Sequence, residues 1–360
     1  MRAPNWLKIE RRPTVSGRTV FIISVSAILA ALLVAAIFFA VFGVSPIHAY
    51  SLILKGALGS RLGLTETVRR AIPLLLIGVG LTIAFRALFW NIGAEGQLLM
   101  GAIAAAGVAL FSGLPDPLLL PVMFIAGFAG GAAWGLIPAV LKVKLGINDV
   151  ITTLMMNYIA IYLMEWLIHG PWKGPTARGF AYTDQFPRAA WLPTLYGTRI
   201  HWPTLVLGLL LTLVMYILVT RTRSGFEIRV VGENPDAARF AGISQFKTTL
   251  LVMLIAGGFA GLAGVGEVAG IHHKLLGPLN ISMGYGYTAI IVAWLARRNP
   301  LAVIITSFLF AIIISGGAVI KVSLELPFQL INVFNGLILF FLIGSEVFIR
   351  YKVSFSFRRQ

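Results

Sequence analysis

Long apolar runs, separated by short polar segments, make up most of the pattern along this chain. Several runs approach the roughly 20 residues that a helix needs to cross a bilayer. We therefore predict an all-α, polytopic membrane protein in which residues 1–360 form a single transmembrane domain of about ten helices. The expected spans are residues 20–42, 71–89, 97–111, 118–141, 150–168, 204–220, 248–271, 284–296, 301–320 and 328–349.

Composition supports this class and removes others. Hydrophobic residues make up 58% of the chain and charged residues 12%, more apolar surface than one soluble core of 360 residues needs. The net charge is +16, but the basic residues lie at the ends of apolar runs, which argues against nucleic-acid binding. The chain has no cysteine, so disulfides, thiolate metal sites and a cysteine nucleophile are excluded.

Alternating ten spans from a cytoplasmic N-terminus places both termini in the cytoplasm. The inside segments then carry roughly eighteen Lys and Arg residues against roughly ten outside, as the positive-inside rule requires. This topology puts segments 1–19 and 221–247 in the cytoplasm and the long loop 169–203 on the extracytoplasmic side. The first apolar run is longer than a signal-peptide core and lacks a small-residue cleavage site, so we expect it to be retained as a span.

A polar stretch, NIGAEGQ at residues 91–97, interrupts the apolar pattern after the second expected span. Its glycines permit a turn, and its polar groups need partners. One interpretation is a simple helix break, with Asn91 capping the next helix and Glu95 near its positive end. The other is a discontinuous helix in which Asn91, Glu95 and Gln97 line a path for a solute, because a carboxylate near the membrane tends to face protein or water.

A second polar stretch covers residues 146–158, where Asn148 or Asp149 is expected to cap a helix. That helix carries Asn157 at membrane depth, where an unpaired amide is costly. Asn157 and Tyr158 are candidates either for hydrogen bonds between helices or for lining the same path.

The third stretch, GENPDAARFAGI at residues 232–243, lies in the polar segment between two strong apolar runs. Asn234 suits the cap of a short helix, Pro235 its first turn, Asp236 its positive end and Gly242 its end. Such a helix outside the membrane is either a solvated connector or a docking element. We favour mechanical coupling to a soluble motor protein.

The fourth stretch places Glu267 inside an apolar run, followed by polar and aromatic residues. An ionisable residue at membrane depth is a functional candidate by default. Adjacent His272 and His273 share poor geometry for one metal ion and have no third ligand nearby, so no metal site is expected. A small organic solute fits this composition better, and we add Glu267, Tyr285 and Tyr287 to the candidates for the path.

Glycines recur at four-residue spacing in two of the expected spans, a pattern that lets helix backbones approach closely. We expect most of these contacts within the chain, and a subunit interface is the alternative. The glycines are Gly127, Gly131 and Gly135 in one span and Gly257 and Gly261 in the other.

Missing motifs narrow the function. The sequence has no phosphate-binding G-x-x-x-x-G-K-[ST] loop, no HExxH helix, no nucleophile elbow and no G-x-G-x-x-G fingerprint. The chain is therefore not expected to be an enzyme, and transport is the default. An ion-coupled secondary transporter, with Glu95 or Glu267 as its proton site, is one alternative, and a membrane scaffold is another.

Four motifs together resemble a known family, the inner-membrane permeases of ABC importers for nucleosides and simple sugars, related to ribose and branched-chain amino acid permeases. They are NIGAEGQ (91–97), GINDVITTLMMNYIA (146–160), GENPDAARFAGI (232–243) and GYGYTAIIVAWLARRNP (284–300). The resemblance covers most of the chain and implies a type II-like importer permease. The sequence differs from the usual small, glycine-containing run at residues 294–298.

In that family, the segment resembling 232–243 is a coupling helix held in a groove of the ATP-binding subunit. The resemblance thus implies a coupling role for Ala237, Ala238, Arg239 and Gly242. The full set of expected coupling residues is Glu233, Asn234, Pro235, Ala237, Ala238, Arg239, Gly242 and Ile243.

The resemblance also implies cofactors, partners and location. The chain would bind no cofactor, because ATP and Mg belong to the partner ATPase subunits. An extracytoplasmic substrate-binding protein would deliver the nucleoside or sugar. Loop 169–203 resembles that of the larger of two paired permeases, which favours a heterodimer with a second permease subunit. The chain would be a multi-pass protein in the lipid bilayer of the bacterial cytoplasmic membrane, with no nucleic-acid partner.

Overall fold

The computed structural model describes residues 7–11, 16–177, 179–324 and 329–355. The chain divides into two compact units, a larger one of residues 57–312 and a smaller one of residues 1–56 and 313–360. The larger unit contains the helices α3 (Arg61–Arg86), α4 (Ala94–Phe111), α5 (Asp116–Leu145), α6 (Asp149–His169), α7 (Trp202–Arg221), α8 (Arg223–Glu233), α9 (Pro235–Phe240), α10 (Gln245–Glu267), α11 (Pro278–Ser282) and α12 (Tyr285–Leu295). Helix α13 (Pro300–Ser323) crosses the boundary between the two units. Three short elements complete the larger unit: the turns η1 (Pro175–Ala177) and η2 (Arg188–Ala190) and the π-helical η3 (Val268–His272).

Helix α10 is the centre of the larger unit and packs against α3, α4 and α5. Glycines make these contacts close. A Cβ added at Gly257 would lie 2.5 Å from the carbonyl oxygen of Gly131, and one at Gly131 would lie 2.7 Å from the Cα of Gly261. Gly101 of α4 meets the backbone of Gly261 in the same way. The glycine spacing therefore serves packing within the chain, and the three helices touch backbone to backbone.

Local signals set the helix boundaries. The Ser60 hydroxyl accepts a hydrogen bond from the Gly63 amide at 3.0 Å and begins α3. Asn148 accepts from the Val150 amide at 2.9 Å and begins α6, as predicted. Gly146, with φ of +66°, ends α5 in the left-handed conformation that glycine adopts without strain.

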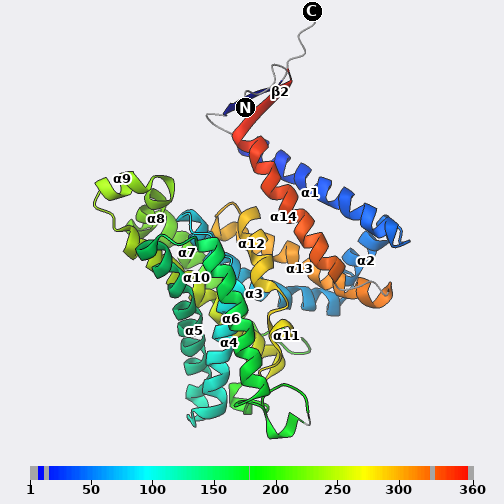
Figure 1. The fold of residues 1–360 in the computed structure, drawn as a ribbon. Helices are drawn as coiled ribbons and strands as arrows, with labels where there is room; N and C mark the ends of the chain where they lie inside the picture. Colours follow the sequence, from blue (N-terminus) through cyan, green and yellow to red (C-terminus); the bar gives the residue numbers. More distant parts are fainter. Residues whose placement is uncertain (1–6, 12–15, 178, 325–328, 356–360) are drawn as a thin grey trace, which may run out of the picture. The chain divides into compact units, whose positions relative to one another are not determined.

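Figure 1 shows two distinct ends of the larger unit. Helices α8 and α9 project at one end, which we call the α9 end. The long connection between α6 and α7, residues 170–201, folds at the opposite end, which we call the loop end. The two polar segments expected on opposite sides of the membrane thus lie at opposite ends of one helical bundle.

The smaller unit contains α1 (Gly17–Val41), α2 (Pro46–Leu58), α14 (Gln329–Arg350) and a two-stranded antiparallel sheet. Its strands β1 (Leu7–Arg11) and β2 (Tyr351–Phe355) pair along their length, which the apolar pattern did not predict. This pairing brings the two end segments together, and the placement of both termini in the cytoplasm stays a prediction. Residues 1–6 and 12–15 of the expected N-terminal segment lie outside the described residues.

Every expected span coincides with a helix, but the count of ten is not confirmed. In the described part of the chain, seven helices are long and apolar enough to cross a membrane, or eight if the bent pair α1 and α2 is one span. That pair bends by 110°. Helix α12 has 11 residues, a rise of about 16 Å that is half a bilayer core. The last span was expected from Phe328, which lies outside the described residues.

Candidate translocation and coupling sites

Side chains from three helices form a fully paired polar network where α4 begins. Asn91 and Gln97 exchange two amide hydrogen bonds, with the Asn91 nitrogen donating to Gln97 at 2.9 Å and the Gln97 nitrogen donating to Asn91 at 3.0 Å. The Asn91 oxygen also accepts from the Gly93 amide at 3.0 Å. Gly93, not Asn91, is the N-cap of α4, so the predicted capping role of Asn91 is wrong. Asn91 instead holds the turn that precedes the helix.

Asn157 joins this turn to α6. Its oxygen accepts from the Gly96 amide at 2.8 Å, and its nitrogen donates to the Ile92 carbonyl at 2.9 Å and to the Tyr287 hydroxyl at 3.3 Å. Asn157 is fully buried, so these bonds replace water for two backbone groups at the start of α4. Of the two interpretations left open for Asn157, hydrogen bonding between helices is the one that the structure displays.

Glu95 reaches the beginning of α12. It lies in the first turn of α4, is 1% exposed, and its carboxylate accepts from the Gly286 amide at 2.8 Å. The positive ends of two helix dipoles therefore face one buried carboxylate. We call Asn91, Glu95, Gln97, Asn157 and Tyr287 the α9-end network.

A second polar group lies at the loop end, where η3 follows α10. Glu267 is 1% exposed and lies 3.9 Å from the Arg69 Nη1 atom and 4.0 Å from the His272 Nε2 atom. Arg69 Nε in turn donates to Glu66 at 2.9 Å, and Arg70 Nε lies 4.0 Å from the same carboxylate. We call Glu66, Arg69, Arg70, Glu267 and His272 the loop-end cluster.

The connection between α6 and α7 covers this cluster. The Leu192 amide donates to the Ala269 carbonyl at 2.9 Å, and the Trp191 ring stacks on His273 with centroids 3.9 Å apart. His201, directly before α7, is fully buried, and its Nδ1 bonds the Thr204 hydroxyl. Burial and the positive charge of Arg69 lower the pKa of His201 to about 4, so its imidazole is neutral near pH 7.

The tyrosine candidates divide between surface and core. Tyr158 is 49% exposed and Tyr287 38%, so both reach the outside of this chain, whereas Tyr285 is fully buried beside the loop-end cluster. Within the described residues, no group of three or more His, Asp or Glu side chains could hold a metal ion.

At the α9 end, the short helix α9 has the ends that its sequence predicts. The Asn234 side chain accepts from the Asp236 and Ala237 amides at 3.1 and 3.0 Å, and Pro235 begins the first turn. Gly242 has φ of +74°, and the next amide, of Ile243, donates back to the Ala238 carbonyl at 2.9 Å. This is the Schellman arrangement that ends a helix in glycine.

Comparison with known proteins identifies the chain. The model of the family described as branched-chain amino acid transport system / permease component matches residues 63–343. A glucose ABC transporter permease protein of Haloferax volcanii is 37% identical, over 98% of this chain and 95% of the relative. A nucleoside ABC transporter permease protein of Lactococcus lactis is 32% identical, over 88% of each chain. A guanosine ABC transporter permease protein of Bacillus subtilis is 31% identical, over 89% of this chain and 92% of the relative.

The chain belongs to this family of ABC transporter permeases. It is therefore a multi-pass protein of the cytoplasmic membrane, and the predicted class is confirmed. The comparisons give no support to an ion-coupled carrier acting alone.

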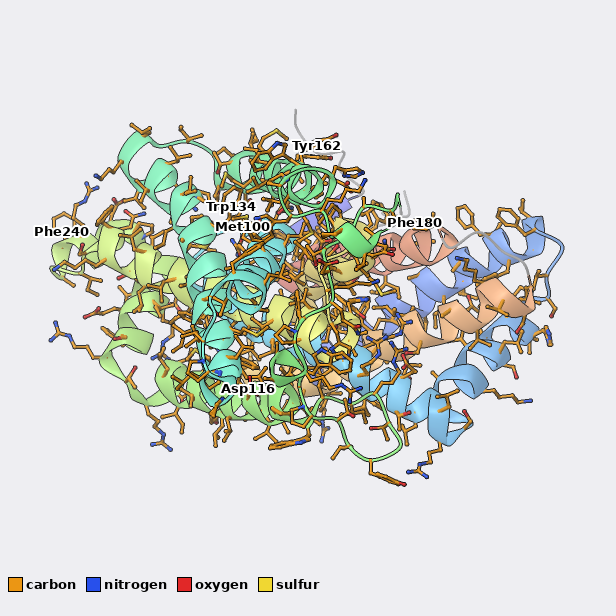
Figure 2. All side chains as sticks on the ribbon, turned by 90° about the horizontal axis from the view of Figure 1, so that it is seen from below. Met100, Asp116, Trp134, Tyr162, Phe180 and Phe240 are labelled. Carbon is orange, nitrogen blue, oxygen red and sulfur yellow. The ribbon has the colours of Figure 1, made fainter. Side chains whose placement is uncertain are left out.

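Most of the residues expected to couple the permease to a partner are exposed on or beside α9, with one exception and one addition. Glu233, Asn234, Pro235, Ala237, Arg239 and Gly242 are exposed, and Ile243 is partly exposed. Ala238 is fully buried, so it packs α9 onto its own chain and presents no side chain outward. Phe240 is 94% exposed, projects away from the neighbouring helices in Figure 2, and was missing from the predicted set. An aromatic residue at the end of a capped helix was its only signal.

Sequence reasoning also missed the positive half of the loop-end cluster. Arg69 and Arg70 follow Glu66 directly before an apolar run, and three charged residues in that position are the signal that was available.

The unusual run 294–298, at the end of α12, has an observed role. Trp294 packs against Trp90 with ring centroids 5.0 Å apart, and Arg298 accepts a hydrogen bond on its carbonyl from Arg86 at 2.7 Å.

Proposed function

We propose that this permease carries a nucleoside or a simple sugar into the cell as one of two paired permeases of an ABC importer. The observation that carries the proposal is α9, a rigidly capped helix that projects at one end of the bundle with its aromatic and basic side chains exposed. Nothing in the described packing of this chain requires an exposed phenylalanine there. A groove in a motor subunit would bury it.

In this proposal, a separate ATP-binding subunit holds ATP and Mg and carries out hydrolysis, and the permease itself binds no cofactor. Closure of two such subunits pulls on α9 through Arg239 and Phe240. The pull reaches the membrane through α8, because the backbone of Gly232 touches the end of α3 at Arg86. The α9 end is then cytoplasmic and the loop end extracytoplasmic, where a substrate-binding protein delivers the solute.

The substrate class and the pairing come from the relatives. Those named for glucose, nucleosides and guanosine all match this chain over most of its length. Two different guanosine permease proteins of Bacillus subtilis match it, as do two glucose permease proteins of Haloferax volcanii, which supports a heterodimer. The solute would pass beside the exposed Tyr158 and Tyr287, between the two permeases.

The test is co-purification of the transporter followed by ATP-driven uptake in proteoliposomes. We expect a phosphate-loop ATPase and a second permease to accompany this chain. Reversing the charge of α9 with Arg239→Glu should lower uptake at least tenfold while the chain stays in the membrane. Arg223→Glu, a matched reversal on α8, should change uptake less than twofold. Uptake that persists without ATP, or equal effects of both variants, would refute the proposal.

A further inference from the structure

Buried polar atoms without hydrogen-bond partners gather at the loop end of the permease. Among the described residues, eight buried side-chain nitrogen and oxygen atoms have no partner. Both carboxylate oxygens of Glu267 and the Nε2 atom of His272 are among them, and so is the Nε atom of Arg70. A buried polar atom left without a partner has lost its hydrogen bonds to water and gained none in return, which destabilises the fold. Such a concentration in one place leaves bonds that a water or a solute hydroxyl can complete.

The spacing of the cluster says what kind of group fits. Glu267 Oε2 lies 3.9 Å from Arg69 Nη1 and 4.0 Å from His272 Nε2, too far for direct hydrogen bonds of about 2.7–3.2 Å. One oxygen atom placed beside each gap can lie within hydrogen-bond distance of both sides. The oxygen beside Arg69 must donate to the carboxylate and accept from the guanidinium, and the oxygen beside His272 can donate to the Nε2 atom. A hydroxyl group does both.

Charge restricts the ligand further. A free cation at Glu267 would face Arg69 and Arg70, and Arg199 lies 3.6 Å from Glu66 on the same side. A free anion would face the buried Glu267 and the partly exposed Glu66. A neutral solute with several hydroxyls meets neither penalty. Two gaps that share one carboxylate call for two hydroxyls on adjacent carbons.

We infer that Glu267, Arg69 and His272 form a recognition site in the permease for a vicinal diol of the transported solute. The inference rests on the proposed function, since nucleosides and simple sugars both carry such a diol. It assigns the permease a selectivity of its own, separate from that of a substrate-binding protein. His273, which follows His272 in the chain, stacks on the Trp191 ring with centroids 3.9 Å apart, so the connection between α6 and α7 contacts the segment that carries the site.

The test is equilibrium binding to the full chain purified in lipid nanodiscs without any binding protein. The probes are uridine and D-glucose, each compared with its matched analogue that lacks the vicinal diol, 2′,3′-dideoxyuridine and 2,3-dideoxy-D-glucose. We expect at least one diol probe to bind at least tenfold more tightly than its analogue. Glu267→Gln should remove that preference. Glu165→Gln, at an exposed carboxylate of the loop end, should retain it.

Equal binding of a probe and its analogue, or no binding of either diol probe, would overturn the inference. If Glu267→Gln does not fold, the preference of the unchanged chain still decides. ATP-driven uptake by the whole transporter distinguishes a failure of this diol site from a failure of the proposed function. Uptake of a sugar or nucleoside with no diol preference in the permease leaves the proposed function standing and refutes only this site.

Discussion

The α9-end network and the loop-end cluster both bury polar side chains in the same helical bundle, but they differ in how completely those side chains are hydrogen-bonded. At Asn91, Glu95, Gln97 and Asn157, no buried side-chain nitrogen or oxygen lacks a partner among the described residues. At the loop end, both oxygens of Glu267 lack a hydrogen-bond partner at the same degree of burial. Burial alone therefore does not tell which polar groups hold the fold together. Hydrogen-bond satisfaction distinguishes the two regions, because a complete network stabilises one arrangement whereas the loop-end groups keep free the bonds that we propose for a solute.

The largest effect is expected from breaking the complete network. Asn157→Leu leaves the Gly96 amide and the Ile92 carbonyl without their partners, which should destabilise the fold by about 2–6 kcal/mol at 1–3 kcal/mol for each group. Thermal unfolding of the purified permease measures the change. Asn280→Leu, the same substitution at an exposed residue of α11, should change stability by less than about 1 kcal/mol. Equal effects would show that the network does not hold the fold.

A smaller loss is expected where α12 begins. A Cβ at Gly286 would lie 2.5 Å from the Cα of Glu95, so Gly286→Ala forces the two backbones apart at a cost of about 1–3 kcal/mol. At Gly266 the nearest atom to an added Cβ is 3.4 Å away, an ordinary contact. Gly266→Ala is therefore the control and should keep the unfolding temperature of the unchanged permease. A Gly286→Ala protein that unfolds with the control would contradict the close approach of α4 and α12.

The smallest effect on stability is expected at the loop end and sharpens the comparison most. Glu267→Gln removes a buried charge that has no hydrogen bond to lose, and its attraction to Arg69 is offset by the desolvation of both ions. We expect the free energy of unfolding to change by no more than about 1 kcal/mol in either direction. Uptake should nevertheless fall. A loss of stability as large as that of Asn157→Leu would mean that the two regions do not differ.

The sequence predicted helices better than it predicted contacts. Apolar length locates each helix because a lipid-facing helix must be apolar, and the ends of α6 and α9 follow from single residues, Asn148 and Gly242. Gly43 and Pro46 mark the break between α1 and α2, but they do not tell a sharp bend within one span from a loop after it. The pairing of β1 with β2 has no local signal, because its two strands come from opposite ends of the sequence.

For the site, residue type identified the candidates but not their partners. Asn157 and Glu267 were both singled out as polar groups at membrane depth, yet only the fold shows that Asn157 is hydrogen-bonded whereas Glu267 has ion-pair contacts and no hydrogen bond. Arg69 contacts Glu267 across nearly two hundred positions of sequence, a separation that no local pattern can bridge. In the sequence, Phe240 is indistinguishable from an apolar residue that packs its helix onto the protein. Only the fold shows that no other element covers it.

The backbone contacts among α4, α5 and α10 also bear on how this permease can evolve. Where Gly101, Gly131 and Gly261 meet, there is no room even for a single methyl group. Even the smallest substitution, glycine to alanine, would therefore disturb the contact. Related permeases can differ in polar, charged and aromatic side chains at the two ends of the bundle, and such differences can change which solute is carried or which ATPase subunit is bound. We therefore expect a scan of all single substitutions to find the permease least tolerant at the glycine contact between those ends.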